Sequence, residues 1–154
     1  MLYGIALILI LLIDQFTKAI ADFSGVHITL IKNVLSLDIT MNSGAAWGMF
    51  ADKEWGQLFF AIVTSIALVA IVVFFIVDKK DSAWLNFSIT LISAGALGNM
   101  IDRIVFSSVR DFINLQIFNC NVADIAITIG GIMFVVYFLF MDENALFVPK
   151  RKKQ

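Results

Sequence analysis

The chain has 154 residues, of which 60% are hydrophobic and only 15% are charged, whereas an ordinary soluble domain has roughly 25% charged residues. A net charge of −1 gives no broad basic surface, which argues against nucleic acid as a partner. One cysteine and one histidine exclude an internal disulfide and a metal site built from several such ligands. The sequence predicts a single integral membrane domain over residues 1–154.

Four apolar stretches are long enough to cross a membrane as helices, which takes about 20 residues each. They cover about residues 2–21, 56–77, 83–104 and 122–141. The first stretch begins Met-Leu-Tyr-Gly and carries its charges after the apolar run, the reverse of a secretory signal peptide, so we expect it to be retained. The pattern predicts an all-α membrane protein with four transmembrane helices.

Basic residues predict the orientation. Lys79 and Lys80 lie between the second and third spans, and residues 142–154 form a basic tail, so these segments and both termini are expected to be cytoplasmic. The segment 22–54 then faces outward. Its apolar runs at 27–31 and 34–40 predict a small extracytoplasmic β-sheet, or cradle, between helices 1 and 2. His27 lies in the first run, where we expect a surface or packing role.

Ionisable residues are costly within a span and usually face a bundle interior or water. In the expected topology they gather at the outer ends of three spans, spaced three or four residues apart, so that each set shares one helix face. The sets are Asp14 with Lys18, Asn99 with Asp102 and Arg103, and Asn121 with Asp124. Gly95 and Gly98, one turn below, would let another helix or a substrate chain approach closely.

Each set also has a purely structural interpretation. Asp14 with Lys18 would be a local ion pair that neutralises itself. Asp102 with Arg103 would be an anchor at the headgroups. Asp124 would be an N-cap or first-turn carboxylate that the helix dipole favours.

Together, however, the polar residues exceed what anchoring requires. A fourth carboxylate, Asp111, lies in the aliphatic and aromatic setting Val109-Arg110-Asp111-Phe112-Ile113, where partial desolvation would raise its pKa. Two aspartates that share one proton can hydrolyse a peptide bond without a covalent intermediate. The same groups would suit a proton- or cation-conducting membrane protein, which is the alternative function. A small scaffold or partner-binding protein would leave the cluster unexplained.

Five short motifs follow one another along the chain and resemble those of the bacterial lipoprotein signal peptidases, the type II signal peptidases. Asp14-Gln15-Phe16-Thr17-Lys18 matches D-Q-x-T-K, and Asn42-Ser43-Gly44-Ala45-Ala46-Trp47 matches N-x-G-A-A-[FW]. Gly95-Ala96-Leu97-Gly98-Asn99-Met100-Ile101-Asp102-Arg103 matches G-A-x-G-N-x-x-D-R. Val109-Arg110-Asp111-Phe112 matches V-x-D-F, and Asn121-Val122-Ala123-Asp124 matches N-x-A-D.

The resemblance implies an aspartyl endopeptidase that removes the signal peptide from diacylglyceryl-modified prolipoproteins, cutting before the lipidated cysteine. It implies Asp111 and Asp124 as the catalytic dyad, with Asp102 as a support for Arg103 or the nearby backbone. The substrate-binding or supporting residues would be Asp14, Lys18, Asn42, Gly44, Asn99, Asp102, Arg103 and Asn121.

The resemblance also implies a location and partners. The site would lie at the outer leaflet of the bacterial cytoplasmic (inner) membrane, among membrane lipids, in a multi-pass protein. No metal or organic cofactor is expected. A globomycin-like cyclic-peptide inhibitor would bind in the same cleft as the lipidated prolipoprotein.

The sequence departs from the family pattern at two places. Cys120 stands where the family usually has phenylalanine, and we expect a small packing residue because no base for a nucleophilic thiol is evident. Only 12 residues separate Asp111 from Asp124, fewer than is usual. Both differences bear on how the outer rim of the site is built.

Overall fold

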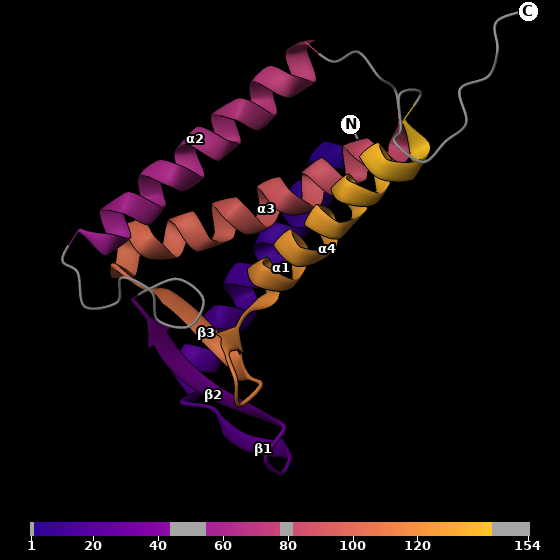
Figure 1. Cartoon of the computed structure of the whole chain (residues 1–154). Coiled ribbons are helices and arrows are strands. Elements are labelled where there is room, and N and C mark those ends of the chain that lie inside the picture. Colours follow the sequence, from indigo (N-terminus) through magenta and orange to yellow (C-terminus); the bar gives the residue numbers. More distant parts are fainter. Residues whose placement is uncertain (1, 44–54, 78–81, 143–154) are drawn as a thin grey trace, which may run out of the picture.

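Four helices and four short strands make up the computed structural model of the chain, which describes residues 2–43, 55–77 and 82–142 (Figure 1). In chain order the elements are α1 (Leu2–Ser24), β1 (His27–Ile31), β2 (Leu35–Asn42), α2 (Gly56–Val77), α3 (Ala83–Phe106), β3 (Val109–Asn114), β4 (Asn119–Cys120), α4 (Val122–Val136) and the π-helical turn η2 (Tyr137–Met141). The four predicted helices are confirmed, although α1 and α3 end slightly later than expected.

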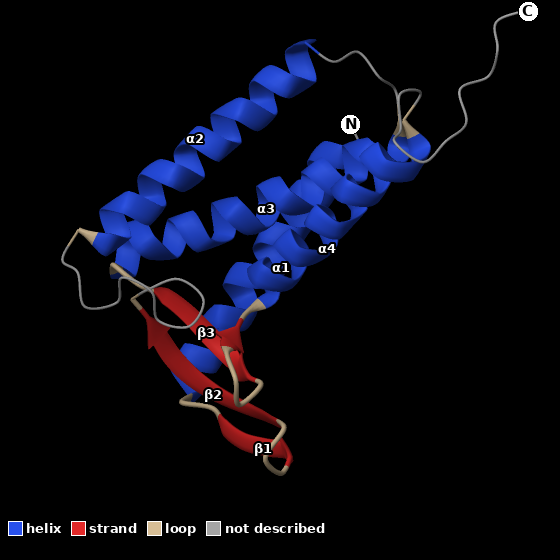
Figure 2. Ribbon diagram, viewed as in Figure 1, coloured by secondary structure: helices blue, strands red, loops and turns tan. Residues whose placement is uncertain are grey.

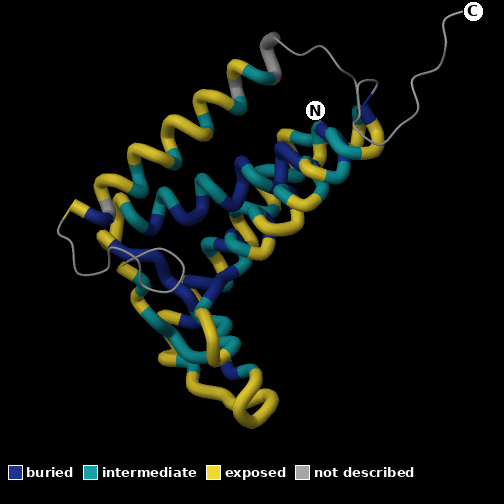
Figure 3. The backbone as a smooth tube through the Cα atoms, viewed as in Figure 1, coloured by how far each residue is buried: buried dark blue, intermediate teal, exposed yellow. Residues whose placement is uncertain are grey.

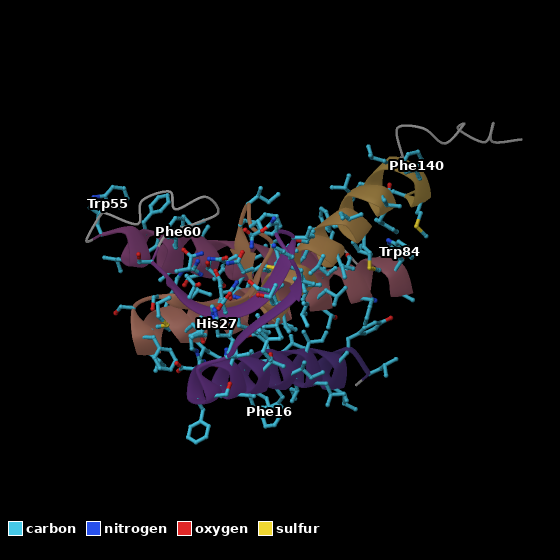
Figure 4. The ribbon with its side chains drawn as sticks, turned by 90° about the horizontal axis from the view of Figure 1, so that it is seen from below. Phe16, His27, Trp55, Phe60, Trp84 and Phe140 are labelled. Carbon is cyan, nitrogen blue, oxygen red and sulfur yellow. The ribbon has the colours of Figure 1, made fainter. Side chains whose placement is uncertain are left out.

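Three helical segments are long and apolar enough to cross a membrane, namely Leu2–Ser24, Ala83–Phe106 and Val122–Met141. The apolar helical stretch within α2 is shorter, Leu58–Ile71, so a fourth span stays a prediction. Large apolar side chains cover much of the outer surface. Phe16, for example, is 66% exposed and points away from the other helices (Figure 4). Such a surface suits lipid as the surrounding solvent.

α3 packs against α1, α2 and α4, and many of its residues are buried (Figure 3). Glycines let α4 approach closely. A Cβ atom on Gly95 would collide with the carbonyl oxygen of Ala123, and one on Gly130 would lie 2.6 Å from the carbonyl oxygen of Ser88. The close approach predicted at Gly95 is therefore a contact between two helices.

A four-stranded antiparallel sheet in the order β1-β2-β3-β4 lies at one end of the bundle (Figure 2). β1 and β2 confirm the small sheet predicted after the first helix. The prediction that the sheet lies between helices 1 and 2 is wrong in part, because β3 and β4 come from the connection between α3 and α4. Adjacent polar residues, Arg110 and Asp111, hide β3 in the sequence, since they break the alternation that marks a half-buried strand.

The two ends of the bundle differ in chemistry. Away from the sheet, Leu85, Ile89 and Tyr137 form an apolar core, against which Phe74 and Phe134 pack. The N-terminal end of α1 and the end of η2 also lie at that end of the bundle (Figure 1). Nitrogen and oxygen atoms instead gather where the strands meet the helices (Figure 4). The fold therefore places the polar residues of three helices beside the sheet.

Candidate active site

A cavity of about 280 Å³ opens between the sheet and those ends of α3 and α4 that lie beside it. Asp111 lines it from β3, and Asp124 lines it from the first turn of α4. Other side chains of the wall that matter to its chemistry are those of Asn42, Asn99, Arg103 and Cys120. The structure thus brings both members of the expected dyad to one space.

The carboxylate of Asp111 is almost fully buried, with 1% of the residue exposed. β3 holds it in register by pairing Asp111 with Thr40 of β2. Asn42 donates a hydrogen bond of 2.8 Å to Oδ2, and Asn121 donates one of 2.6 Å to Oδ1. The pKa of Asp111 is raised to about 6, chiefly by burial and also by the charge of Asp124, against the lowering effect of the two amide donors.

Asp124 is the third residue of α4 and takes part in a reciprocal capping box with Asn121. Its Oδ2 accepts the main-chain N–H of Asn121 at 3.1 Å, and its own N–H donates to Oδ1 of Asn121 at 2.9 Å. The structural interpretation of Asp124 as a first-turn carboxylate is therefore confirmed. It is not the whole role, because Oδ1 accepts a hydrogen bond of 2.8 Å from Asn99 and the residue also lines the cavity.

Lys18 lies behind the cavity wall and is fully buried. Its Nζ lies 2.9 Å from Oδ2 of Asp14 and donates to Oδ1 of Asn99 at 2.9 Å. The other oxygen of Asp14 accepts the main-chain N–H of Ala123 at 2.8 Å, which satisfies a donor at the start of α4. The pair is therefore more than a local ion pair, because it joins α1 to both α3 and α4.

Asp102 is fully buried and acts as a support, but its arginine partner is Arg110 and not Arg103. Of the two supports expected of Asp102, Arg103 or the nearby backbone, its hydrogen bonds show the second, because Arg103 lines the cavity while Asp102 contacts Lys18 of α1 and Arg110 of β3. Asp102 does hold nearby backbone, since its Oδ2 accepts the N–H of Arg110 at 2.9 Å. The Nζ atom of Lys18 also lies 3.5 Å from Oδ2 of Asp102.

Sequence reasoning gave no role to two residues of this network, Arg110 and Gln15. The Nε2 group of Gln15 donates to the carbonyl oxygen of Gly98 at 3.0 Å and to Asp14 at 3.1 Å, and its Oε1 accepts from Arg110 at 3.2 Å. Both residues lie inside the quoted motifs. In the sequence, the position of Arg110 directly before Asp111, in an otherwise apolar run, was the one indication that this arginine would also be buried.

Arg103 brings a positive charge to the cavity wall. Its guanidinium carbon lies 5.3 Å from the centre of the Phe60 ring, in a cation–π arrangement that joins α3 to α2. Its Nε atom is buried and has no hydrogen-bond partner among the described residues. An unsatisfied buried donor on a cavity wall is a group that a bound ligand could satisfy.

The remaining predicted residues lie elsewhere. Asp14, Lys18, Asp102 and Asn121 stand behind the lining residues, and Gly44 lies outside the described residues. Within residues 2–43, 55–77 and 82–142, no group of three or more histidine, cysteine or acidic side chains could hold a metal ion.

Two further residues behave as expected. Cys120 is buried, as expected of a packing residue. Its pKa is raised to about 11, first by burial and then by the charges of Asp124 and Asp111. The side chain of His27 is 86% exposed on β1, where it pairs with Asp38, which agrees with a surface role.

Known proteins match the chain along most of its length. The model of the family Signal peptidase (SPase) II matches residues 6–140. The lipoprotein signal peptidase of Staphylococcus haemolyticus (strain JCSC1435) is 39% identical over 149 residues, which cover 92% of each chain. That of Staphylococcus aureus (strain JH9) is 38% identical over 145 residues, which cover 89% of this chain and 87% of the relative.

Solved structures agree with the sequence relatives. A bacterial membrane enzyme determined by the in meso method at 2.3 Å resolution has a TM-score of 0.80 at 36% identity, covering 89% of this chain and 87% of that one. Another, at 1.9 Å resolution, has a TM-score of 0.79 at 34% identity, covering 91% and 94%. With its apolar helices, the chain is therefore an integral membrane protein, and it belongs to the signal peptidase II family of peptidases.

Proposed function

We propose that this protein removes the signal peptide from prolipoproteins by aspartyl hydrolysis, cutting just before the diacylglyceryl-modified cysteine. The observation that carries the proposal is that Asp111 and Asp124 line one cavity and are both hydrogen-bonded by Asn121. Family membership supports the class of substrate, because the relatives are lipoprotein signal peptidases.

In the proposed reaction the two carboxyl groups hold one proton between them. The ionised group takes a proton from a water molecule, whose oxygen attacks the scissile carbonyl carbon, while the protonated group donates to the carbonyl oxygen. Collapse of the tetrahedral diol delivers a proton to the amide nitrogen and breaks the C–N bond. The products are a carboxyl group and an amine. The raised pKa of Asp111 supports a retained proton. An ordinary aspartate, with a pKa of about 4, has already lost its proton at pH 6, whereas Asp111 with a pKa of about 6 still holds it in half of the molecules.

The cavity wall supplies groups that would bind the substrate main chain. The buried Nε of Arg103 has no partner among the described residues, and it would donate to a peptide carbonyl oxygen. Asn42 and Asn99 lie beside it on the wall. We assign Asp14 and Lys18 to the support of this wall, together with Asp102 and Asn121, and a globomycin-like cyclic peptide would occupy the same cavity.

The proposed site lies at the outer leaflet of the bacterial cytoplasmic membrane, with both termini and the basic tail in the cytoplasm. A lipidated cysteine cannot leave the bilayer, so its peptide bond must be cut at the membrane surface. The cavity lies where the ends of α3 and α4 meet the sheet, which suits that depth. In this arrangement α2 forms the fourth span, and membrane lipids surround the bundle.

A proton or cation path has less support. The charged residues of α1, α3 and α4 gather at the sheet end of the bundle, whereas a path needs polar groups across the whole span. Hydroxyl groups nearer mid-span donate to their own helices: Ser65 to the carbonyl oxygen of Ala61, and Thr128 to that of Asp124. Ser65 also approaches Sδ of Met100 on α3 at 3.7 Å, but a thioether has no proton to pass on, so this contact is not a proton relay.

Gel-shift cleavage of a lipidated prolipoprotein tests the proposal, with wild type, Asp111→Asn and Asp124→Asn in matched detergent. Both variants should fold and lose cleavage. Lys32→Gln removes an exposed charge between β1 and β2 and should keep it. Near-normal turnover by either folded aspartate variant would refute the dyad. Proton or cation flux in proteoliposomes, without any cleavage, would support the ion path instead.

A further inference from the structure

β3 presents its side chains to two different environments. Val109 and Asp111 line the cavity, as expected for alternate residues of a strand, while Phe112 lines an apolar pocket against α1 with Thr17 and other residues. Arg110 is not among the residues that line the cavity, and it is 5% exposed. The proposed reaction gives it no task, although burial of a guanidinium group is costly unless it is fully paired.

The guanidinium group of Arg110 is held by a carboxylate, an amide and an aromatic ring. Its Nη2 donates to Oδ1 of Asp102 at 2.8 Å, and its Nε donates to Oδ2 of the same carboxylate at 3.3 Å, which is a two-pronged arginine–carboxylate pair. Nη2 also donates to Gln15 at 3.2 Å. The guanidinium carbon lies 4.2 Å from the centre of the Phe106 ring. A lysine could supply the charge here but not the fork or the planar stacking.

The main chain of Arg110 is held from both sides. Its N–H donates to Oδ2 of Asp102 at 2.9 Å, and its carbonyl oxygen accepts Nδ2 of Asn121 at 3.4 Å. That carbonyl group belongs to the peptide unit that leads into Asp111. The same Nδ2 of Asn121 donates to Oδ1 of Asp111. A shift of β3 away from α3 would therefore disturb the contacts of the Asp111 carboxylate.

The charges behind the cavity wall are also balanced. Asp14 and Asp102 are both fully buried, and they face two buried cations, Lys18 and Arg110. Without Arg110, Asp102 would keep a 3.3 Å hydrogen bond from the neutral amide of Gln15 and one ion-pair contact among the described residues, with Lys18, which lies closer to Asp14. An uncompensated buried carboxylate would have to move toward water or take up a proton.

We propose that Arg110 is a positioning residue for the dyad. Its guanidinium group and its main-chain N–H both bind Asp102, which fixes β3 against α3 and so holds Asp111 beside Asp124. The inference rests on the proposed function, since it assigns Arg110 a part in the same reaction. In this proposal Asp102 supports the dyad indirectly, by binding Arg110. Arg103 remains free of this task and would bind the substrate.

The test compares Arg110→Gln and Arg110→Lys with wild type in prolipoprotein cleavage, over a range of pH. We expect Arg110→Gln to lower kcat by about 100-fold, the usual order of cost for a small misplacement of reacting groups, with little change in KM. Arg110→Lys should recover part of the loss. Lys32→Gln, which removes an exposed positive charge, should behave as wild type.

The pH profile distinguishes positioning from a purely structural role. Two carboxyl groups that share a proton titrate in two steps, and the separation of the steps measures how strongly the groups interact. Misplacement of Asp111 should bring the two limbs of the profile closer together in Arg110→Gln. Loss of folded enzyme alone would lower the whole profile and leave the separation unchanged. The titratable or charged groups around the site that are the same in wild type and in Arg110→Gln are Asp14, Lys18, Asp102, Arg103, Asp111, Cys120 and Asp124.

Wild-type kcat in Arg110→Gln would overturn the inference. So would a loss that disappears once activity is expressed per folded molecule, with the limb separation unchanged. Asp111→Asn and Asp124→Asn are measured in parallel. If either remains active, the proposed function itself fails. If both are inactive while Arg110→Gln behaves as wild type, only the role of Arg110 fails.

Discussion

The side-chain amide of Asn121 donates a 2.6 Å hydrogen bond to Oδ1 of Asp111, while the same residue caps α4, the helix that carries Asp124. One asparagine thus holds one carboxylate by its side chain and the other by its main chain. Its two tasks can be separated by substitution.

Asn121→Ser keeps an oxygen that can cap α4 but loses the amide donor to Asp111, whereas Asn121→Ala loses both. Both variants should lose about 100-fold in kcat, because a small misplacement of a reacting group costs about that much. Only the alanine variant should also lose about 1 kcal/mol of stability with the cap. Cleavage kinetics and thermal unfolding in detergent measure the two effects, and an equal loss of stability in both variants would contradict the separation.

The raised pKa of Asp111 predicts a pH-dependent cost to the fold. Its folded value of about 6 lies above the ordinary 3.8, so the folded state binds the proton more tightly. Ionisation therefore destabilises the folded protein as pH rises from about 4 to about 6, and the penalty is complete above that range. Asp111→Asn cannot ionise, so its unfolding midpoint relative to wild type should rise over the same interval and then level off.

Asp38 provides a control of opposite sign. Its pKa is lowered, first by the hydrogen bond from Ser36, so its contribution to stability is present at higher pH and is lost as pH falls below about 4. The midpoint of Asp38→Asn relative to wild type should therefore fall, not rise, as pH increases through that lower range. A rise in both variants would point to a general effect of pH on the detergent complex.

Cys120 reports on the electrostatics of the cavity, because it is the only cysteine of the chain. With a pKa of about 11, the thiol should react slowly with iodoacetamide at neutral pH and about tenfold faster for each unit of pH, since the thiolate is the nucleophile. Asp124→Asn removes a nearby negative charge and should speed labelling at fixed pH. Mass spectrometry follows the reaction, and a rate that does not depend on pH would contradict the raised pKa.

Gly98 and Gly131 offer a matched pair of helical glycines. A Cβ on Gly98 would lie 2.5 Å from Oδ2 of Asp14, a carboxylate already held by Lys18, whereas a Cβ on Gly131 would meet nothing within 4 Å. Gly98→Ala should cost about 1–3 kcal/mol through overpacking and should lower cleavage by displacing Asp14. Gly131→Ala should stabilise by up to about 1 kcal/mol and leave cleavage unchanged. Unfolding and cleavage assays check both, and equal effects of the two substitutions would contradict this packing.

Sequence reasoning reached the helices and the polar end of the bundle because helical spacing alone puts Asp14 with Lys18 and Asn99 with Asp102 on common faces. Hydrophobic length likewise located the four helices, three of which are long and apolar enough to cross a membrane. Motif resemblance, more than spacing, selected Asp111 from the other carboxylates. The structure places Asp111 on the cavity wall, while its catalytic role stays a prediction.

The strand β3 and the partner of Asp102 could not be predicted, because both depend on contacts between residues that are distant or offset in the sequence and that no local pattern indicates. β3 is recognisable only through its partner β2, since both of its faces are covered near Arg110 and Asp111 and polar residues occur side by side. The partner of Asp102 was missed for the same reason. Neighbours in sequence favoured Arg103, but the turn after α3 brings Arg110 back onto the carboxylate.

The bond between Asp14 and the N–H of Ala123 joins residues 109 positions apart, across α1 and α4. During synthesis, the first and third helices would reach the bilayer before the residues that complete the cavity exist. Under the proposed function, a chain interrupted before α4 would carry no carboxylate pair and would be hydrolytically silent. The ability to hydrolyse a peptide bond would then arise only when insertion of the chain is nearly finished.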